Sequence, residues 1–109
     1  MGRGLMRWRP SEAGGRLNGR PSSSQYAASA VFVLGGDAEV LPGWPGSAER
    51  FSIGFNLLPG PQPDWEPVEF DFLARDLVLD KVHPGAEMLI TEGWQVVAEL
   101  RVTQVLVDY

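Results

Sequence analysis

The chain has 109 residues, of which 44% are hydrophobic, and a formal net charge of −5. This length predicts one small domain with a single hydrophobic core, and the apolar content excludes a wholly disordered chain. The absence of cysteine excludes disulfides, thiolate metal sites and a cysteine nucleophile. No apolar run approaches the roughly 18–20 residues that span a membrane, and residues 1–10 lack the apolar stretch of a secretion signal. We therefore expect a cytoplasmic protein with no membrane segment.

Charge is distributed unevenly along the chain. Residues 1–26 carry five arginines and one acid, whereas residues 27–109 carry four basic residues and thirteen acids. An acidic body repels phosphate backbones, so nucleic acid would have to be contacted through the arginine-bearing N-terminal part. The simpler interpretation is that scattered arginines only keep the surface soluble.

The N-terminal half contains one ambiguous stretch and two predicted strands. The stretch "SEAGGRLNGRPSSSQY", residues 11–26, has the composition of a disordered tail but could equally be a loop of the fold. "AASAVFVL", residues 27–34, is apolar on both faces, which is typical of a strand covered on both sides. In "RFSIGFNL", residues 50–57, alternation with period two predicts a strand with one apolar face. That face consists of Phe51, Ile53, Phe55 and Leu57.

The C-terminal half continues the alternation. "VEFDF", residues 68–72, predicts another strand, and further strands are expected over 85–93 and 95–107. "FLARDLVLDK", residues 72–81, allows a short helix because leucines recur at helical spacing, although neighbouring apolar residues blur this pattern. Nine prolines and thirteen glycines, mostly in turn-like clusters, leave no room for a long helix. Short strands with frequent turns predict a small antiparallel barrel or sandwich.

The C-terminal quarter, "HPGAEMLITEGWQVVAELRVTQVL", resembles the closing hairpin of the third domain of elongation factor Tu. The shared pattern is Pro-Gly, an apolar strand, Glu-Gly and a final strand. Pro84 and Gly85 open it here, and Glu92 and Gly93 form the turn. A glycine at position 93 permits the positive φ that a tight hairpin needs.

The resemblance extends to the N-terminal part and covers residues 5–107. Gly14, Gly15 and Arg16 match the Gly-Gly-Arg loop after the family's first strand, and Tyr26 matches the tyrosine that opens the second. Pro45-Gly46 is similar to the Pro-Gly that begins the fourth strand. This match places the fourth strand at residues 50–57. An alternative register assigns it to residues 67–72, and the two registers stay open.

This chain departs from the family pattern at several places. Gln25 and Ala27 replace the residues that flank the family's tyrosine, and Ala98 and Leu100 replace glycines of the last strand. Residues 58–82 are longer than the corresponding link. No stretch fits the phosphate-binding loop of a GTPase. The resemblance therefore implies the barrel without the GTPase domain.

The fold implied by the resemblance is a closed or partly open six-stranded antiparallel β-barrel formed by residues 1–109 as one domain. Leu5–Arg9 would be its first strand, preceded by disordered residues 1–4. Gly14-Gly15-Arg16 would be the pivot of an ordered connection that ends at Tyr26. A barrel of this size has an interior filled by side chains, so a large internal ligand cavity is not expected.

The function implied by the resemblance is a non-catalytic interaction module, because the family's barrel packs on a GTPase domain and helps to hold aminoacyl-tRNA. A protein partner is favoured over RNA because residues 27–109 are strongly acidic. We expect no catalytic residue, metal ligand or cofactor, and the sequence leaves the oligomeric state open. The candidate partner-binding residues are Arg7, Arg9, Arg16, Arg20 and Tyr26.

The alternative function is a small enzyme, or a metal- or small-molecule-binding barrel, that uses the acidic residues 64–83. Its best candidates are Asp64, Glu66 and His83, since paired carboxylates can perform acid–base chemistry or bind a hard cation. His83 is the sole histidine and directly precedes a proline, which is typical of an ordinary turn residue. The competing interpretation of the carboxylates is a solvated strand face.

Overall fold

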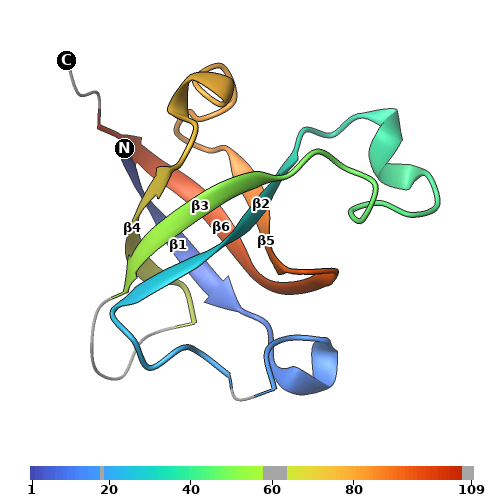
Figure 1. Ribbon diagram of the computed structural model, residues 1–109. Coiled ribbons are helices and arrows are strands. Elements are labelled where there is room, and N and C mark those ends of the chain that lie inside the picture. Colours follow the sequence, from blue (N-terminus) through green and yellow to red (C-terminus); the bar gives the residue numbers. More distant parts are fainter. Residues whose placement is uncertain (18, 58–63, 107–109) are drawn as a thin grey trace.

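The computed structural model describes residues 1–17, 19–57 and 64–106 of the chain. Its strands close into a barrel in the order β1-β4-β3-β2-β5-β6, with every neighbouring pair antiparallel (Figure 1). This architecture confirms the predicted all-β, six-stranded antiparallel barrel. The strands are β1 (Gly2–Trp8), β2 (Gln25–Val33), β3 (Phe51–Leu57), β4 (Glu66–Phe72), β5 (Glu87–Glu92) and β6 (Gln95–Val105).

Helical structure in the described residues is limited to three short 3-10 turns, Ser11–Ala13, Asp37–Val40 and Arg75–Leu77. The short helix that the sequence allows over residues 72–81 is therefore reduced to a single turn. Phe72 belongs to β4 because its ring is buried and stacks on Phe32 of β2, with centroids 5.8 Å apart. Within the described part of the chain, no helix is long and apolar enough to cross a membrane.

Both segments that competed to be the fourth strand are strands. Residues 51–57 form β3, and β4 follows it both in the chain and in the barrel, with Phe55 opposite Phe70. Of the two alternatives, the segment at 67–72 is therefore the fourth strand in chain order, and the segment at 50–57 is the third. Part of the long link between them, residues 58–63, lies outside the described residues.

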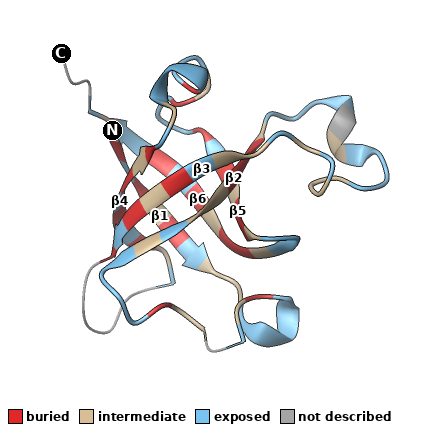
Figure 2. Cartoon of the chain, in the orientation of Figure 1, coloured by how far each residue is buried: buried red, intermediate tan, exposed pale blue. Residues whose placement is uncertain are grey.

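The barrel interior is filled by apolar side chains, as the buried positions along the strands show in Figure 2. Alternation places Ile53, Phe55 and Leu57 of β3 inside, and the other strands contribute in the same way. Val78 and Val82 of the β4–β5 loop join this core although they lie outside any strand. The packed interior agrees with the expectation that a barrel of this size holds no large ligand.

The first four residues are not the disordered segment that the sequence suggests, because Gly2–Trp8 forms β1 and pairs with both β4 and β6. A Cβ at Gly2 would lie 2.6 Å from the Phe70 ring, and one at Gly4 would lie 2.6 Å from the Arg101 carbonyl oxygen. Glycines that suggest flexibility in the sequence are here required by close packing.

The antiparallel order divides the connections between two ends of the barrel. At what we call the upper end lie the β2–β3 loop (34–50), the β4–β5 loop (73–86), the start of β1 and the end of β6 (Figure 1). At the lower end lie the β1–β2 connection (9–24), the end of β3, the start of β4 and the β5–β6 hairpin. The two ends differ in the kinds of side chain that they carry, as described below.

Candidate functional site

The β1–β2 connection is an anchored part of the fold. Gly14 adopts a positive φ of 89°, and a Cβ on Gly15 would lie 1.9 Å from the Arg9 carbonyl oxygen, so neither position tolerates a side chain. The Gln95 side-chain amide donates to the Gly14 carbonyl oxygen at 2.7 Å and also to that of Gly15. The Gly-Gly-Arg segment therefore fastens this connection to the start of β6.

Arg16 and Tyr26 share one carboxylate at the lower end. The Arg16 Nε lies 2.9 Å from Glu92 Oε2, the Tyr26 hydroxyl donates to the same oxygen, and the guanidinium lies over the tyrosine ring. Burial raises the pKa of Tyr26 above its ordinary range, and the hydrogen bond to Glu92 raises this pKa further. Both predicted partner-binding residues thus make internal contacts.

Arg20 makes the second internal ion pair of the lower end. Its Nε lies 2.8 and 3.0 Å from the two oxygens of Glu66, whose side chain is only 1% exposed. The Trp8 indole N–H donates to the same carboxylate, and the Trp8 ring meets Tyr26 edge-on. A buried carboxylate needs such partners, so Arg20 stabilises the closed lower end.

The other two predicted residues, Arg7 and Arg9, lie on the outer face of β1 and β6. Both pair with Glu99, at 2.8 and 3.5 Å. The Arg7 guanidinium lies 4.7 Å from the centroid of Trp65, and that of Arg101 lies 5.1 Å from it. Sequence reasoning missed Trp65 and Arg101 as their companions, because only the β1–β4 and β1–β6 registers bring these side chains together.

Most of the positive charge of this outer cluster is neutralised, because its three arginines face the carboxylates of Glu87 and Glu99. Arg101 also pairs with Glu87 at 3.5 Å, and a hollow of about 360 Å³ lies over the cluster. Since each arginine already faces a carboxylate, the cluster keeps a net charge of only about +1, which attracts a phosphate backbone weakly.

The upper end has a different character, because it holds most of the large apolar side chains exposed to solvent. Seven of the nine such residues in the described part of the chain lie on its loops or at the end of β6. The two others, Leu17 and Trp94, lie at the lower end. The seven are Leu34, Val40, Leu41, Leu73, Leu77, Leu79 and Leu106.

Internal contacts order both loops of the upper end. The Glu39 carboxylate accepts hydrogen bonds from the backbone N–H groups of Leu34 and Gly35, at 2.6 and 3.0 Å. In the β4–β5 loop, Val78 is wholly buried, and the Val82 N–H donates to its carbonyl oxygen at 3.1 Å. Anchored loops of this kind hold their leucines outward.

A hollow of about 370 Å³ lies between the β2–β3 loop and the barrel wall. Phe32 and Phe51 of the wall, Trp44 of the loop and Lys81 of the β4–β5 loop contribute to its lining. Both loops of the upper end therefore border one partly apolar depression.

The residues of the alternative function are not brought together. Glu66 lies at the lower end and is occupied by Arg20 and Trp8, whereas His83 lies on the β4–β5 loop of the upper end. Asp64 lies two residues before Glu66 and is exposed. Among the described residues, no group of three His, Asp or Glu side chains could hold a metal ion. The geometry thus gives no support to a metal or acid–base site built from these residues.

Comparison of the chain with protein-family models, with curated proteins and with solved structures finds no match.

Proposed function

We propose that this protein is a non-catalytic interaction module whose upper end docks on a protein partner. The observation that carries the proposal is the gathering of seven exposed large apolar side chains at one end of a closed barrel. The resemblance to the third domain of elongation factor Tu supports the same role, because the barrel of that family acts through its contacts with other molecules and domains. The proposed setting is the cytoplasm.

Exposed apolar surface of this kind favours protein binding. Scattered leucines need no explanation, but several exposed apolar side chains on one ordered loop are suited to a protein–protein contact. Leu73, Leu77 and Leu79 lie within seven residues of one ordered loop. Burial of a leucine side chain contributes roughly 1.5–3 kcal/mol, so a few of them supply much of the affinity of a small interface.

An RNA partner is less well supported. Arg16 and Arg20 bind internal carboxylates, and Arg7 and Arg9 share Glu99. Phosphate binding would require these arginines to exchange an existing partner for a new one, in a molecule with a net charge of −5. Absence of RNA binding even at low salt is the result that we expect from a filter-binding titration.

The proposal is tested by removing leucines from the upper end and comparing the proteins that cross-link to the barrel in its native cell. We expect Leu77→Ser/Leu79→Ser to lose a partner that the unchanged protein captures. Leu17→Ser is the control, because Leu17 is at least as exposed as Leu77 and Leu79 but lies at the lower end. Equal capture by the double variant and the unchanged protein, measured by quantitative mass spectrometry, would contradict the proposal.

A further inference from the structure

The β2–β3 loop (34–50) covers part of the outer face of β2. Val31 faces outward, because its two neighbours in the chain belong to the core, yet it is only 1% exposed. Trp44 and Ala48 of the loop line the hollow that Val31 borders. The loop therefore lies against the barrel wall.

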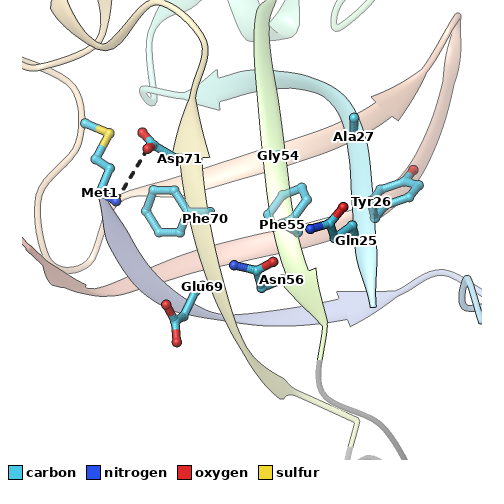
Figure 3. A pocket seen from close by; sticks show the side chains of 10 residues that line it. All are labelled: Met1, Gln25, Tyr26, Ala27, Gly54, Phe55, Asn56, Glu69, Phe70 and Asp71. Atoms are coloured by element: carbon cyan, nitrogen blue, oxygen red, sulfur yellow. Dashed lines mark ion pairs between the residues drawn. The ribbon is translucent and has the colours of Figure 1, made fainter. Parts of the chain in front are cut away.

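No described loop covers the outer face of β3 and β4 in the same way. Gly54 of β3 is partly exposed there, and a Cβ placed on it would meet no atom within 4 Å. Figure 3 shows this open face, on which the Met1 amino group lies 3.9 Å from the Asp71 carboxylate. The contrast raises the question of what holds the β2–β3 loop against β2.

Arg50, the last residue of this loop, joins it to the β5–β6 hairpin. Its Nη1 donates to the Gly93 carbonyl oxygen at 2.7 Å, and its guanidinium lies 4.7 Å from the centroid of a Trp94 ring. Its Nη2 lies 3.5 Å from the Gly46 carbonyl oxygen. The loop backbone runs beside the same indole, since a Cβ on Gly46 would lie 3.5 Å from Trp94 Cε3. We call Gly46, Arg50, Gly93 and Trp94 the hairpin clasp.

The tip of the hairpin is itself fixed, so it can support a loop. Glu92 pairs with Gln95 across the turn, and the Glu92 carboxylate binds Arg16 and Tyr26. The Gln95 side-chain amide donates to the Gly14 carbonyl oxygen at 2.7 Å. The four consecutive residues 92–95 therefore contact both long connections of the barrel, β1–β2 through Glu92 and Gln95 and β2–β3 through Gly93 and Trp94.

The clasp gives a reason for an exposed indole at the lower end. Trp94 is 82% exposed and lies apart from the apolar side chains of the upper end. An indole that buries so little area contributes mainly through the attraction between its ring and a cation, and Trp is the best ring for this contact. Its position over the Arg50 guanidinium thus accounts for the ring without an occupant from outside the chain.

Both ends of the β2–β3 loop are now accounted for. Glu39 accepts hydrogen bonds from the backbone at the start of the loop, and Arg50 fastens its end. The exposed side chains of Val40 and Leu41 lie between these two points. A loop that is ordered before binding does not lose its conformational entropy when a partner arrives, so its apolar side chains bind more tightly.

We propose that Arg50 and Trp94 are positioning residues of the docking surface, which hold the β2–β3 loop so that Val40 and Leu41 face the partner. They act on binding through the loop and do not touch the partner. This inference rests on the proposed function in taking Val40 and Leu41 as part of the docking surface, but it can fail separately.

Hydrogen exchange of two loop amides tests the clasp without any partner. The Ser47 and Ala48 N–H groups donate within the loop, at 2.9 and 3.0 Å, so their exchange reports its opening. Arg50→Met should speed this exchange about tenfold, as loss of a hydrogen bond from a charged donor predicts. Trp94→Ala should speed it roughly threefold, as loss of an exposed cation–π contact predicts. Unchanged exchange in Arg50→Met would overturn the proposal.

Two further variants make this test specific. Arg50→Met/Trp94→Ala should exchange about as fast as Arg50→Met, because both changes remove one shared contact, and fully multiplied effects would contradict the clasp. Gln95→Ala is the matched control on the same hairpin, since Gln95 contacts only the other connection in the contacts described above. It should leave Ser47 and Ala48 unchanged, and faster exchange there would show that any damage to the hairpin loosens the loop. All these variants should keep a cooperative thermal transition, because the clasp lies outside the core.

Partner capture then separates positioning from direct contact. Arg50→Met and Trp94→Ala should each capture at least about threefold less of the partner by quantitative mass spectrometry, in step with their faster exchange. Loss of capture in Trp94→Ala with unchanged exchange would mean that the indole touches the partner, and would overturn the positioning role.

The same measurement distinguishes failure of this inference from failure of the proposed function. If Arg50→Met captures the partner that Leu77→Ser/Leu79→Ser loses, positioning by the clasp fails while docking through the upper end stands. If Arg50→Met loses the partner and Leu77→Ser/Leu79→Ser keeps it, the clasp stands and the β4–β5 loop is not part of the docking surface.

Discussion

Tyr26 is the residue whose environment gives the clearest dependence on pH. Burial raises its pKa above the ordinary value of 10.0, and the hydrogen bond to Glu92 adds to this effect. The folded state therefore retains a proton that the unfolded state releases near pH 10. The contribution of Tyr26 to stability is complete below pH 10 and is lost as the pH rises above it. We expect the melting temperature to fall above pH 10.

The variant Tyr26→Phe is the control for this prediction. It lacks the titrating hydroxyl but keeps the ring that packs on Trp8 and Phe55. Its melting temperature should decline less steeply above pH 10 than that of the unchanged protein. The same alkaline decline in both proteins, measured by calorimetry, would assign the effect to other groups.

Gly15 is a second residue at which a small substitution should change the stability of the protein. Gly15→Ala would place a Cβ 1.9 Å from the Arg9 carbonyl oxygen, so the backbone has to shift. We expect this variant to lose roughly 1–3 kcal/mol of unfolding free energy, as overpacked sites do. Gly36→Ala is the matched control, since its Cβ meets no atom within 4 Å, and it should stay within about 0.5 kcal/mol of the unchanged protein. Urea titration measures both values.

At the scale of elements, the β1–β2 connection depends on the ion pair between Arg20 and Glu66. Arg20→Met would leave a carboxylate that is 1% exposed without its charged partner, and we expect it to lower the unfolding free energy by about 3 kcal/mol. Arg7→Met removes an exposed partner of Glu99 and should cost less than about 1 kcal/mol. Similar losses of unfolding free energy in the two variants, measured by urea titration, would show that the burial of Glu66 does not make its ion pair with Arg20 more stabilising than an exposed one.

The strands were predictable from sequence where one face is buried, because alternation then carries the information. Residues 50–57 and 68–72 are examples, and both are strands with their predicted apolar faces inside. The last strand was harder, since Val97 and Ala98 are both buried next to a register shift at Ile90 and Thr91 that breaks the alternation. A bulge changes which residue faces inward, and the local sequence pattern does not predict where a bulge occurs.

The candidate site was less predictable than the fold. Arginines near glycines suggested a partner surface, yet the carboxylates that bind Arg16 and Arg20 lie 76 and 46 residues further along the chain. Only closure of the barrel brings these charges together. The exposed leucines were equally hard to predict, because the pattern "FLARDLVLDK" does not show that Val78 faces the core while Leu77 and Leu79 face solvent.

At the scale of the whole molecule, closure depends on β1, which pairs with both β4 and β6. Removal of residues 1–9 would expose two strand edges and open the core, so we expect loss of the cooperative thermal transition. A synthetic peptide of residues 1–9 should restore this transition when added in excess. A truncated chain that still melts cooperatively without the peptide, as followed by circular dichroism, would show that closure is not needed for folding.

The position of β1 between β4 and β6 also has a consequence for synthesis on the ribosome. β1 leaves the ribosome first, but its partners lie about 60 and 95 residues later in the chain. At about 5–20 residues per second, β1 waits roughly 5–20 seconds for its second partner. The β2–β3 pair and the β5–β6 hairpin can form as soon as they emerge. The nascent chain therefore carries one edge of β1 unpaired until β6 has emerged, and the ring of strands closes only then.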